Sequence, residues 1–281
     1  AREFGAEAVM FGAPHPLTTA VPRLRDELGI PVGILCHGAE VTIPAGIPGL
    51  RSWLRRTLAS ADVLFAVSRY TQARVSRLTG REVIAIGAGV DIDTFAPAES
   101  APANEPPVVG CVSRFVPRKG QHRLIAAAAE LANRNVEVEL LMVGKGRMER
   151  RLRRLASRSG VSVRFEIDVP WDRLGGLYRE MDIFCMPCRT RWGGLEIEGL
   201  GLVFLEAAAC GLPVLAGSSG GSPETVIPAE TGFVVDSVSD IVEGVEILLG
   251  DREQAAAMGA KGRRRVVEEY VWDRVVADVI G

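Results

Sequence analysis

Two glutamates, Glu198 and Glu206, flank seven residues that include two glycines in the stretch GGLEIEGLGLVFLEAAACGLPVLAGSSGGSPETV. Gly199 and Gly201 disfavour a helix through both glutamates, because each glycine costs about 1 kcal/mol relative to alanine. We therefore expect Glu198 to end a loop and Glu206 to lie about one turn into the following helix. Carboxylates there could accept hydrogen bonds from sugar hydroxyls while the free amides of the helix start hold a phosphate. A capped helix with one exposed glutamate explains the same spacing equally well.

A second candidate site lies in the stretch SRFVPRKGQ, where Arg114 and Lys119 follow the apolar run VVGCV and precede a predicted helix. A guanidinium fork and a mobile ammonium together suit the oxygens of a diphosphate. Taken alone, such a run of charge is more often a solvated basic loop. Its position after a strand, next to a helix start, favours the diphosphate interpretation.

His37 follows the apolar run PVGILC and is expected at the carboxyl end of a strand, facing a cleft between domains. A single histidine is more often structural than catalytic, and no serine or cysteine nucleophile motif accompanies it. The sequence contains no Walker A loop and no Gly-x-Gly-x-x-Gly opening a helix, so NAD chemistry is not predicted. For the pair Cys185 and Cys188, buried packing is a better interpretation than zinc binding.

The composition narrows the class of protein. The 281 residues are 47% hydrophobic, and 33 basic against 35 acidic residues give a net charge of −2, which offers no general attraction to nucleic acid. Five cysteines, an odd number set in apolar runs, favour a reducing, cytoplasmic setting. No apolar run reaches the roughly 18 residues of a membrane span.

Short apolar runs alternate with helical stretches along the whole chain, which predicts an α/β protein with parallel sheets covered by helices. A proline-rich stretch at residues 94–107 predicts a linker between two doubly wound domains. The expected boundaries are an incomplete first domain at 1–106, a second domain at 107–270 and the start of a returning helix at 271–281. Ligands of such sheets bind beyond the carboxyl ends of the strands.

The stretch GLRSWLRRTLASA carries apolar residues at helical spacing, with arginines on the other faces. We interpret the apolar stripe as a core-facing surface, although tryptophan flanked by arginines is also typical of a helix at a membrane surface. The role of the arginines stays open. The apolar residues are Leu50, Trp53, Leu54 and Leu58, and the arginines are Arg51, Arg55 and Arg56.

Several motifs together resemble a known family. The Glu-x7-Glu spacing with ACGLPVLAGSSGGSPETV, preceded by SRFVPRKG and AGVDIDTFAP, resembles the retaining GT-B glycosyltransferases of family 4. More narrowly, HGAEV, SRFVPRKGQ, CRTRWGGLEIEGLG and SGGSPETV resemble actinobacterial GDP-mannose-dependent mannosyltransferases that act on phosphatidylinositol monomannoside. The resemblance covers nearly the whole chain and implies two Rossmann-like domains facing a cleft, with the first strand and glycine-rich loop of the family lying before Ala1.

The resemblance also implies roles for individual residues. Arg114 and Lys119 would hold the diphosphate of GDP-mannose, with no metal and no further cofactor. Glu198 would bind the donor sugar, Glu206 the ribose, and His37 would lie near the reacting carbon. The amides after Glu198 complete the implied donor site, which comprises Gly199, Leu200, Gly201, Leu202 and Val203.

The implied acceptor is a phosphatidylinositol mannoside lipid, reached by a peripheral protein at the inner face of the plasma membrane. Two alternatives stay open: a family 4 enzyme that uses UDP-glucose or UDP-N-acetylglucosamine, and a sugar-nucleotide-binding protein without transfer activity. Trp192 and Ala39 depart from the pattern of these relatives, which commonly have a small residue and a second histidine there. Oligomeric state is not indicated by the sequence.

Overall fold

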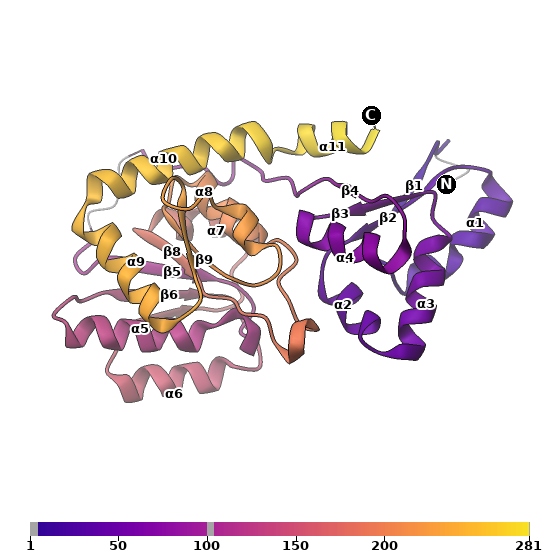
Figure 1. Cartoon of the computed structure of the whole chain (residues 1–281). Helices are drawn as coiled ribbons and strands as arrows, with labels where there is room; N and C mark the ends of the chain where they lie inside the picture. Colours follow the sequence, from indigo (N-terminus) through magenta and orange to yellow (C-terminus); the bar gives the residue numbers. More distant parts are fainter. Residues whose placement is uncertain (1–4, 100–103, 281) are drawn as a thin grey trace.

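The computed structural model describes residues 5–99 and 104–280, which form two parallel sheets flanked by helices (Figure 1). In the first sheet the strand order is β1-β2-β3-β4, and every pair is parallel. Its strands are β1 (Val9–Phe11), β2 (Val32–Cys36), β3 (Val63–Ala66) and β4 (Ile84–Ala85). The connecting helices are η2 (Leu17–Ala20), α1 (Val21–Leu28), α2 (Ala39–Ala45), α3 (Pro48–Ala59) and α4 (Arg69–Thr79).

The second sheet has six parallel strands in the order β10-β9-β8-β5-β6-β7. The strands are β5 (Val108–Val112), β6 (Glu139–Val143), β7 (Val163–Glu166), β8 (Ile183–Met186), β9 (Val214–Gly217) and β10 (Gly232–Val235). From β5, the strands β6 and β7 follow toward one edge of the sheet, and β8, β9 and β10 follow toward the other edge. The direction in which successive strands are added therefore reverses between β5 and β8. The carboxyl ends of β5 and β8 therefore form the topological switch point, where open α/β sheets bind ligands.

Helices cover both faces of the second sheet (Figure 1). They are η3 (Pro117–Lys119), α5 (Gln121–Asn133), α6 (Glu149–Ser159), α7 (Trp171–Arg179), η4 (Trp192–Gly194), α8 (Leu202–Ala209), η5 (Ser222–Thr225) and α9 (Val238–Gly250). Strands β5, β8 and β9 are buried along their whole length, which explains why their sequences are continuously apolar rather than alternating. The predicted α/β architecture with two parallel-sheet domains is confirmed, and the reversal of strand order that defines a doubly wound sheet is present in the second sheet.

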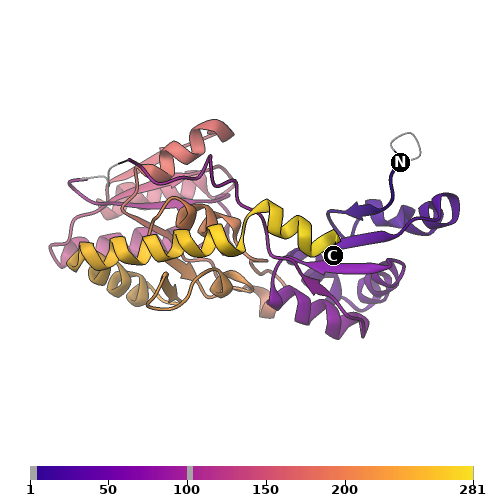
Figure 2. The ribbon, with the colours of Figure 1, turned by 90° about the horizontal axis from the view of Figure 1, so that it is seen from above.

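Two C-terminal helices connect the domains. Helix α10 (Arg252–Glu269) packs along α8, and α11 (Trp272–Ile280) continues over the first domain, as Figures 1 and 2 show. There Val275 forms a small apolar cluster with Phe65 and Ile86 of the first domain. Within the described residues, no helix combines the length and the apolar character needed to cross a bilayer.

The structure corrects one detail of the interpretation of α3. Leu54 and Leu58 are fully buried and Trp53 packs against the same core, as expected, but Leu50 is 45% exposed. Leu50 lies in the first turn of α3 and is not part of the apolar cluster that contains Leu54 and Leu58. Helices α2 and α10 were not predicted, and part of the predicted linker, residues 100–103, lies outside the described residues.

Candidate active site

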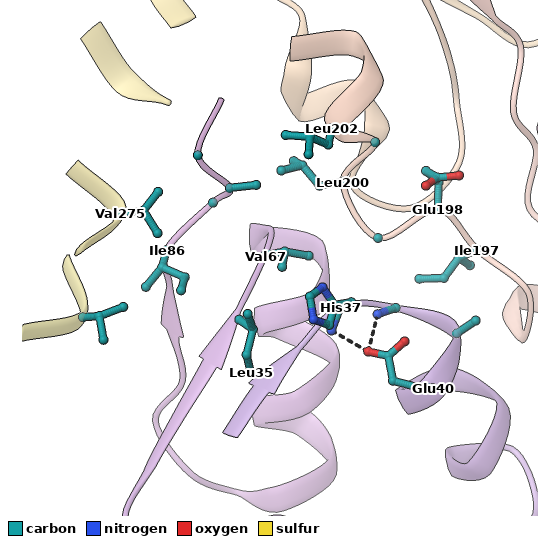
Figure 3. Close-up of a pocket in the computed structure, with 18 of the residues that line it drawn as sticks. Leu35, His37, Glu40, Val67, Ile86, Ile197, Glu198, Leu200, Leu202 and Val275 are labelled. Atoms are coloured by element: carbon teal, nitrogen blue, oxygen red, sulfur yellow. Dashed lines mark hydrogen bonds between the residues drawn. The ribbon is translucent and has the colours of Figure 1, made fainter. Parts of the chain in front are cut away.

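A cavity of about 700 Å³ lies between the two domains and is called the main cleft here (Figure 3). One end is polar, because side chains from the first domain (His37, Glu40) and the second domain (Arg114, Arg118, Glu198) line it. The other end is apolar and is formed by the first sheet, the loop before α8 and helix α11. Its lining includes Leu35, Val67, Ile86, Leu200, Leu202 and Val275.

At the polar end, Glu198 binds two cations from the loop that follows β5. Its Oε2 accepts from Lys119 Nζ at 2.8 Å and also pairs with Arg118 Nη1. All three side chains are nearly buried, with 9 to 12% of each side chain exposed. Lys119 is anchored further by a 3.5 Å contact of Nζ with Met186 Sδ at the end of β8. The cluster therefore sits at the switch point between β5 and β8.

The two cations decide the ionisation of Glu198. Burial alone would raise the pKa of this carboxyl, but the charges of Lys119 and Arg118 and their hydrogen bonds outweigh burial and hold the pKa below its ordinary value. Glu198 is consequently an anion at neutral pH. Because both cations hold Oε2, the other carboxylate oxygen is the one available to accept from a ligand hydroxyl.

The loop after Glu198 brings backbone against the first domain. A Cβ at Gly199 would lie 2.4 Å from the carbonyl oxygen of His37, so only glycine permits this approach. Ser68 Oγ, at the start of α4, donates to the Gly199 carbonyl at 2.7 Å. Gly201 has φ +91° and is the N-cap of α8 without a side-chain cap, so the first amides of α8 remain open to an anion.

His37 faces this loop from the first domain. Its Nε2 lies 2.7 Å from the carbonyl oxygen of Gly12, and because a carbonyl can only accept, the ring carries a proton on Nε2. Glu40 accepts from the backbone N–H groups of His37 and Gly38, which fixes the turn between β2 and α2 (Figure 3). The turn thereby places the imidazole at the edge of the main cleft.

Glu206 is on the inner side of α8. It lies one turn into the helix, as predicted, but it is 4% exposed and does not line the main cleft. Its Oε2 accepts from the hydroxyl of Tyr178 at 2.7 Å. Burial raises the pKa of the Glu206 carboxyl, and the hydrogen bond from Tyr178 offsets this only in part. The fold thus shifts the pKa values of the two glutamates of the motif in opposite directions.

The structure brings most of the predicted residues to one place. The main cleft is lined by His37, Arg114, Glu198, Gly199, Leu200, Gly201 and Leu202. Lys119 does not line the main cleft but forms an ion pair with Glu198, which does. Val203 and Glu206 lie behind the start of α8 and do not line the cleft. Arg118 and Glu40 follow strands, where ligands of such sheets are expected, but no role was predicted for either of them, and Tyr178 carried no signal.

The five cysteines lie in the interior of the protein. All five are free and buried, and burial raises the pKa of Cys188 to about 11 and that of Cys111 to about 12. In the described part of the chain, no group of three or more histidine, cysteine or acidic side chains is placed to hold a metal ion. The interpretation of Cys185 and Cys188 as packing residues is confirmed.

Comparisons with known proteins place these features in context. The family model "Glycosyl transferases group 1" matches residues 93–265, and "Glycosyltransferase Family 4" matches residues 1–94. A GDP-mannose-dependent alpha-(1-6)-phosphatidylinositol monomannoside mannosyltransferase from Mycolicibacterium smegmatis is 43% identical, over 96% of this chain and 74% of the relative. A GDP-mannose-dependent monoacylated alpha-(1-6)-phosphatidylinositol monomannoside mannosyltransferase from Corynebacterium glutamicum is 41% identical, over 97% and 74%.

Solved structures share the fold. Sucrose-phosphate synthase from Thermosynechococcus elongatus superposes with a TM-score of 0.84 at 24% identity, covering 99% of this chain and 73% of that one. Anabaena Alr3699/HepE, solved in complex with UDP and glucose, gives a TM-score of 0.80 at 20% identity, covering 99% and 76%. At these identities the likeness establishes the arrangement of domains alone.

Proposed function

Since the chain belongs to the family 4 glycosyltransferases, we propose that it transfers mannose from GDP-mannose to a phosphatidylinositol mannoside, with retention at the anomeric carbon. The choice of donor and acceptor is supported by relatives that carry this activity in their names and are 41 to 43% identical over nearly all of this chain. The proposed role of the site rests on its geometry.

The observation that carries the proposal is the charged cluster at the switch point. On the second-domain side of the polar end, Arg114, Arg118 and Lys119 supply three positive charges and Glu198 one negative charge, which leaves two positive charges there. The carboxylate of Glu40, on the first-domain side, is taken up by the backbone amides of His37 and Gly38. A nucleoside diphosphate carries roughly the opposite charge. The open amides of α8 add a further anion-binding element at the same place.

The proposed mechanism uses these groups to stabilise the leaving diphosphate. As the glycosidic bond breaks, negative charge grows on the departing phosphate, and preorganised cations lower the barrier because they need not reorient. Glu198 orients the mannose through its available oxygen, and His37 faces the reacting carbon from the first domain. Glu206, behind the start of α8, is proposed to bind the ribose through Oε1, the carboxylate oxygen that Tyr178 does not hold. No metal is required, because the cations take the part that a divalent ion would otherwise play.

The apolar end of the main cleft supports an amphiphilic acceptor. A sugar headgroup near His37 would place its apolar portion against Ile86, Val275 and neighbouring apolar side chains. The protein is proposed to act as a peripheral protein at the cytoplasmic face of the membrane, where both a water-soluble donor and a lipid acceptor are accessible.

The test is a transfer assay on the purified protein, with the family's glycine-rich loop included, using labelled GDP-mannose and phosphatidylinositol monomannoside in vesicles. We expect a lipid product with one added mannose that is lost in Arg114→Gln. Arg154→Gln, an exposed arginine on α6 remote from the cleft, is the matched control and should retain activity.

A parallel thermal-shift series with GDP, UDP and ADP identifies the nucleotide. Stabilisation by GDP alone, with transfer, supports the proposal. Stabilisation by UDP alone, with transfer from UDP-glucose or UDP-N-acetylglucosamine, would replace the donor. Stabilisation by a nucleotide without transfer from any donor would favour a binding protein.

A further inference from the structure

A second hollow, distinct from the main cleft, is lined by three arginines of the first domain. Its volume is about 210 Å³, and Arg51, Arg74 and Arg77 converge on it opposite Gly193 and Gly194 of the second domain. It shares no lining residue with the main cleft. We refer to it as the arginine hollow.

The arginine hollow holds positive charge without a compensating carboxylate. Among the described residues, none of the three guanidinium groups forms a salt bridge, and no acidic side chain lines the hollow. Three other hollows of this chain that contain arginine also contain Asp or Glu. A concave surface with charge of a single sign concentrates counter-ions of the opposite sign.

Local contacts fix the geometry of this hollow. Arg74 Nη2 donates to the Tyr70 hydroxyl at 2.8 Å, and its guanidinium carbon lies 5.3 Å from the centre of the Tyr70 ring. The same nitrogen would lie 3.3 Å from a Cβ at Gly194, which has φ +98°. Arg74 is exposed, but its guanidinium is held by the Tyr70 side chain and lies close to the glycine turn of the second domain.

The second-domain wall is fastened to α2. Thr42 Oγ1 donates to the Leu195 carbonyl at 2.6 Å, and the Leu195 side chain packs so tightly on Gly46 that a Cβ there would lie 2.3 Å from it. The arginine hollow thus exists because the two domains meet at this point.

We propose that the arginine hollow binds a phosphate group, as a free phosphate compound or as the phosphodiester of a lipid headgroup. Guanidinium groups match phosphate oxygens in geometry as well as charge. The volume is about seven times the roughly 30 Å³ that one water occupies in the liquid, so a phosphate fits with its ester substituent directed outward. The site is separate from the diphosphate site and does not depend on which sugar nucleotide the protein uses.

The first test measures inorganic phosphate binding by calorimetry at low ionic strength, with GDP present to occupy the main cleft. The triple variant Arg51→Gln/Arg74→Gln/Arg77→Gln should weaken phosphate binding by about tenfold or more. The double variant Arg55→Gln/Arg56→Gln, which changes exposed arginines of α3 outside the hollow, is the control and should bind as the wild type does. Equal binding by the wild type and the triple variant would overturn the proposal, as would an equal loss in the control.

The second test identifies the source of the phosphate by flotation with phosphatidylcholine vesicles that contain phosphatidylinositol. Loss of vesicle binding in the triple variant alone assigns the site to a lipid headgroup. Unchanged vesicle binding, together with lost phosphate binding, assigns it to a soluble phosphate compound. Because neither readout involves mannose transfer, failure of the transfer assay and failure of this inference are separate results.

Discussion

Isosteric replacement of the two glutamates in the Glu-x7-Glu motif should change stability in opposite directions at neutral pH. In Glu198→Gln, the anion between Lys119 and Arg118 is lost and two nearly buried cations are left facing each other. In Glu206→Gln, a buried carboxylate becomes a neutral amide that can still accept from Tyr178. The first change should destabilise the fold, and the second should be neutral or stabilising.

The magnitude for Glu198→Gln follows from the ion-pair geometry. At 2.8 Å and an effective dielectric constant of about 20, one such contact has a gross attraction of about 6 kcal/mol. Desolvation offsets much of this attraction, and removing one partner of a buried pair typically costs about 3 to 5 kcal/mol. Taking about 3 kcal/mol, we expect Tm to fall by roughly 6 to 12 °C for a protein of this size.

The pH dependence gives an independent check. The pKa of Glu198 is lowered in the fold, so its contribution to stability is present above about pH 4.5 and is lost as pH falls through the lower, folded-state pKa. The pKa of Glu206 is raised, so folding favours its protonated form, and that contribution is lost as pH rises through the folded-state pKa. The Tm deficit of Glu198→Gln should therefore shrink as pH is lowered from 7 to below 4.5.

The assay is thermal unfolding of the wild type and both variants across that pH range, with and without GDP. GDP should raise the Tm of Glu198→Gln more than that of the wild type, because the diphosphate supplies the missing negative charge. Equal losses of Tm in the two variants at pH 7, or a larger loss in Glu206→Gln, would refute the assignment of opposite electrostatic roles.

Three further predictions concern the same site. Arg114→Gln and Lys119→Met should each lower kcat by about 100- to 1000-fold. Only Lys119→Met should also lower Tm, because Lys119 is buried and Arg114 is exposed. Equal Tm values for the two variants would contradict this prediction. EDTA should leave the rate of transfer unchanged, and strict dependence on Mg²⁺ or Mn²⁺ in the same assay would argue against stabilisation of the diphosphate by cationic side chains alone. Glu224→Ala should cost about 1 kcal/mol in denaturant unfolding, because Glu224 caps the start of α4 from the other domain, and an unchanged midpoint would show that this cap contributes no stability.

The fold was predictable from the sequence because buried parallel strands and covering helices leave strong local signals. Runs such as VVGCV and IFCM are apolar at every position, and the structure buries each of these residues. Helix α2 left no such signal, because it has only seven residues and contains Pro44. Helix α10 has a weak apolar period, since several of its buried positions are glycine or alanine.

The partners within the site were less predictable, because they depend on side-chain direction. The sequence places three cations in one loop, but it does not tell which of them turns inward. The short helix η3 ends at Lys119, and this turn directs Arg118 and Lys119 toward Glu198 while Arg114 stays exposed at the rim. Likewise, the position of Glu206 in α8 was predictable from spacing, but its burial against Tyr178 depends on the packing of α7.

The contacts that join the domains are made by the same segments that carry the site. The Glu198–Gly201 loop approaches the His37 turn through Gly199, and Thr71 of α4 donates to the His37 carbonyl at 2.7 Å. Glu224 accepts from two backbone amides at the start of α4, each at 2.8 Å. A displacement of either domain would therefore break the contacts that position His37 and Glu198 relative to each other. It follows that the polar end of the main cleft is assembled by domain contact, so substitutions at this interface should alter the site even where they touch no ligand.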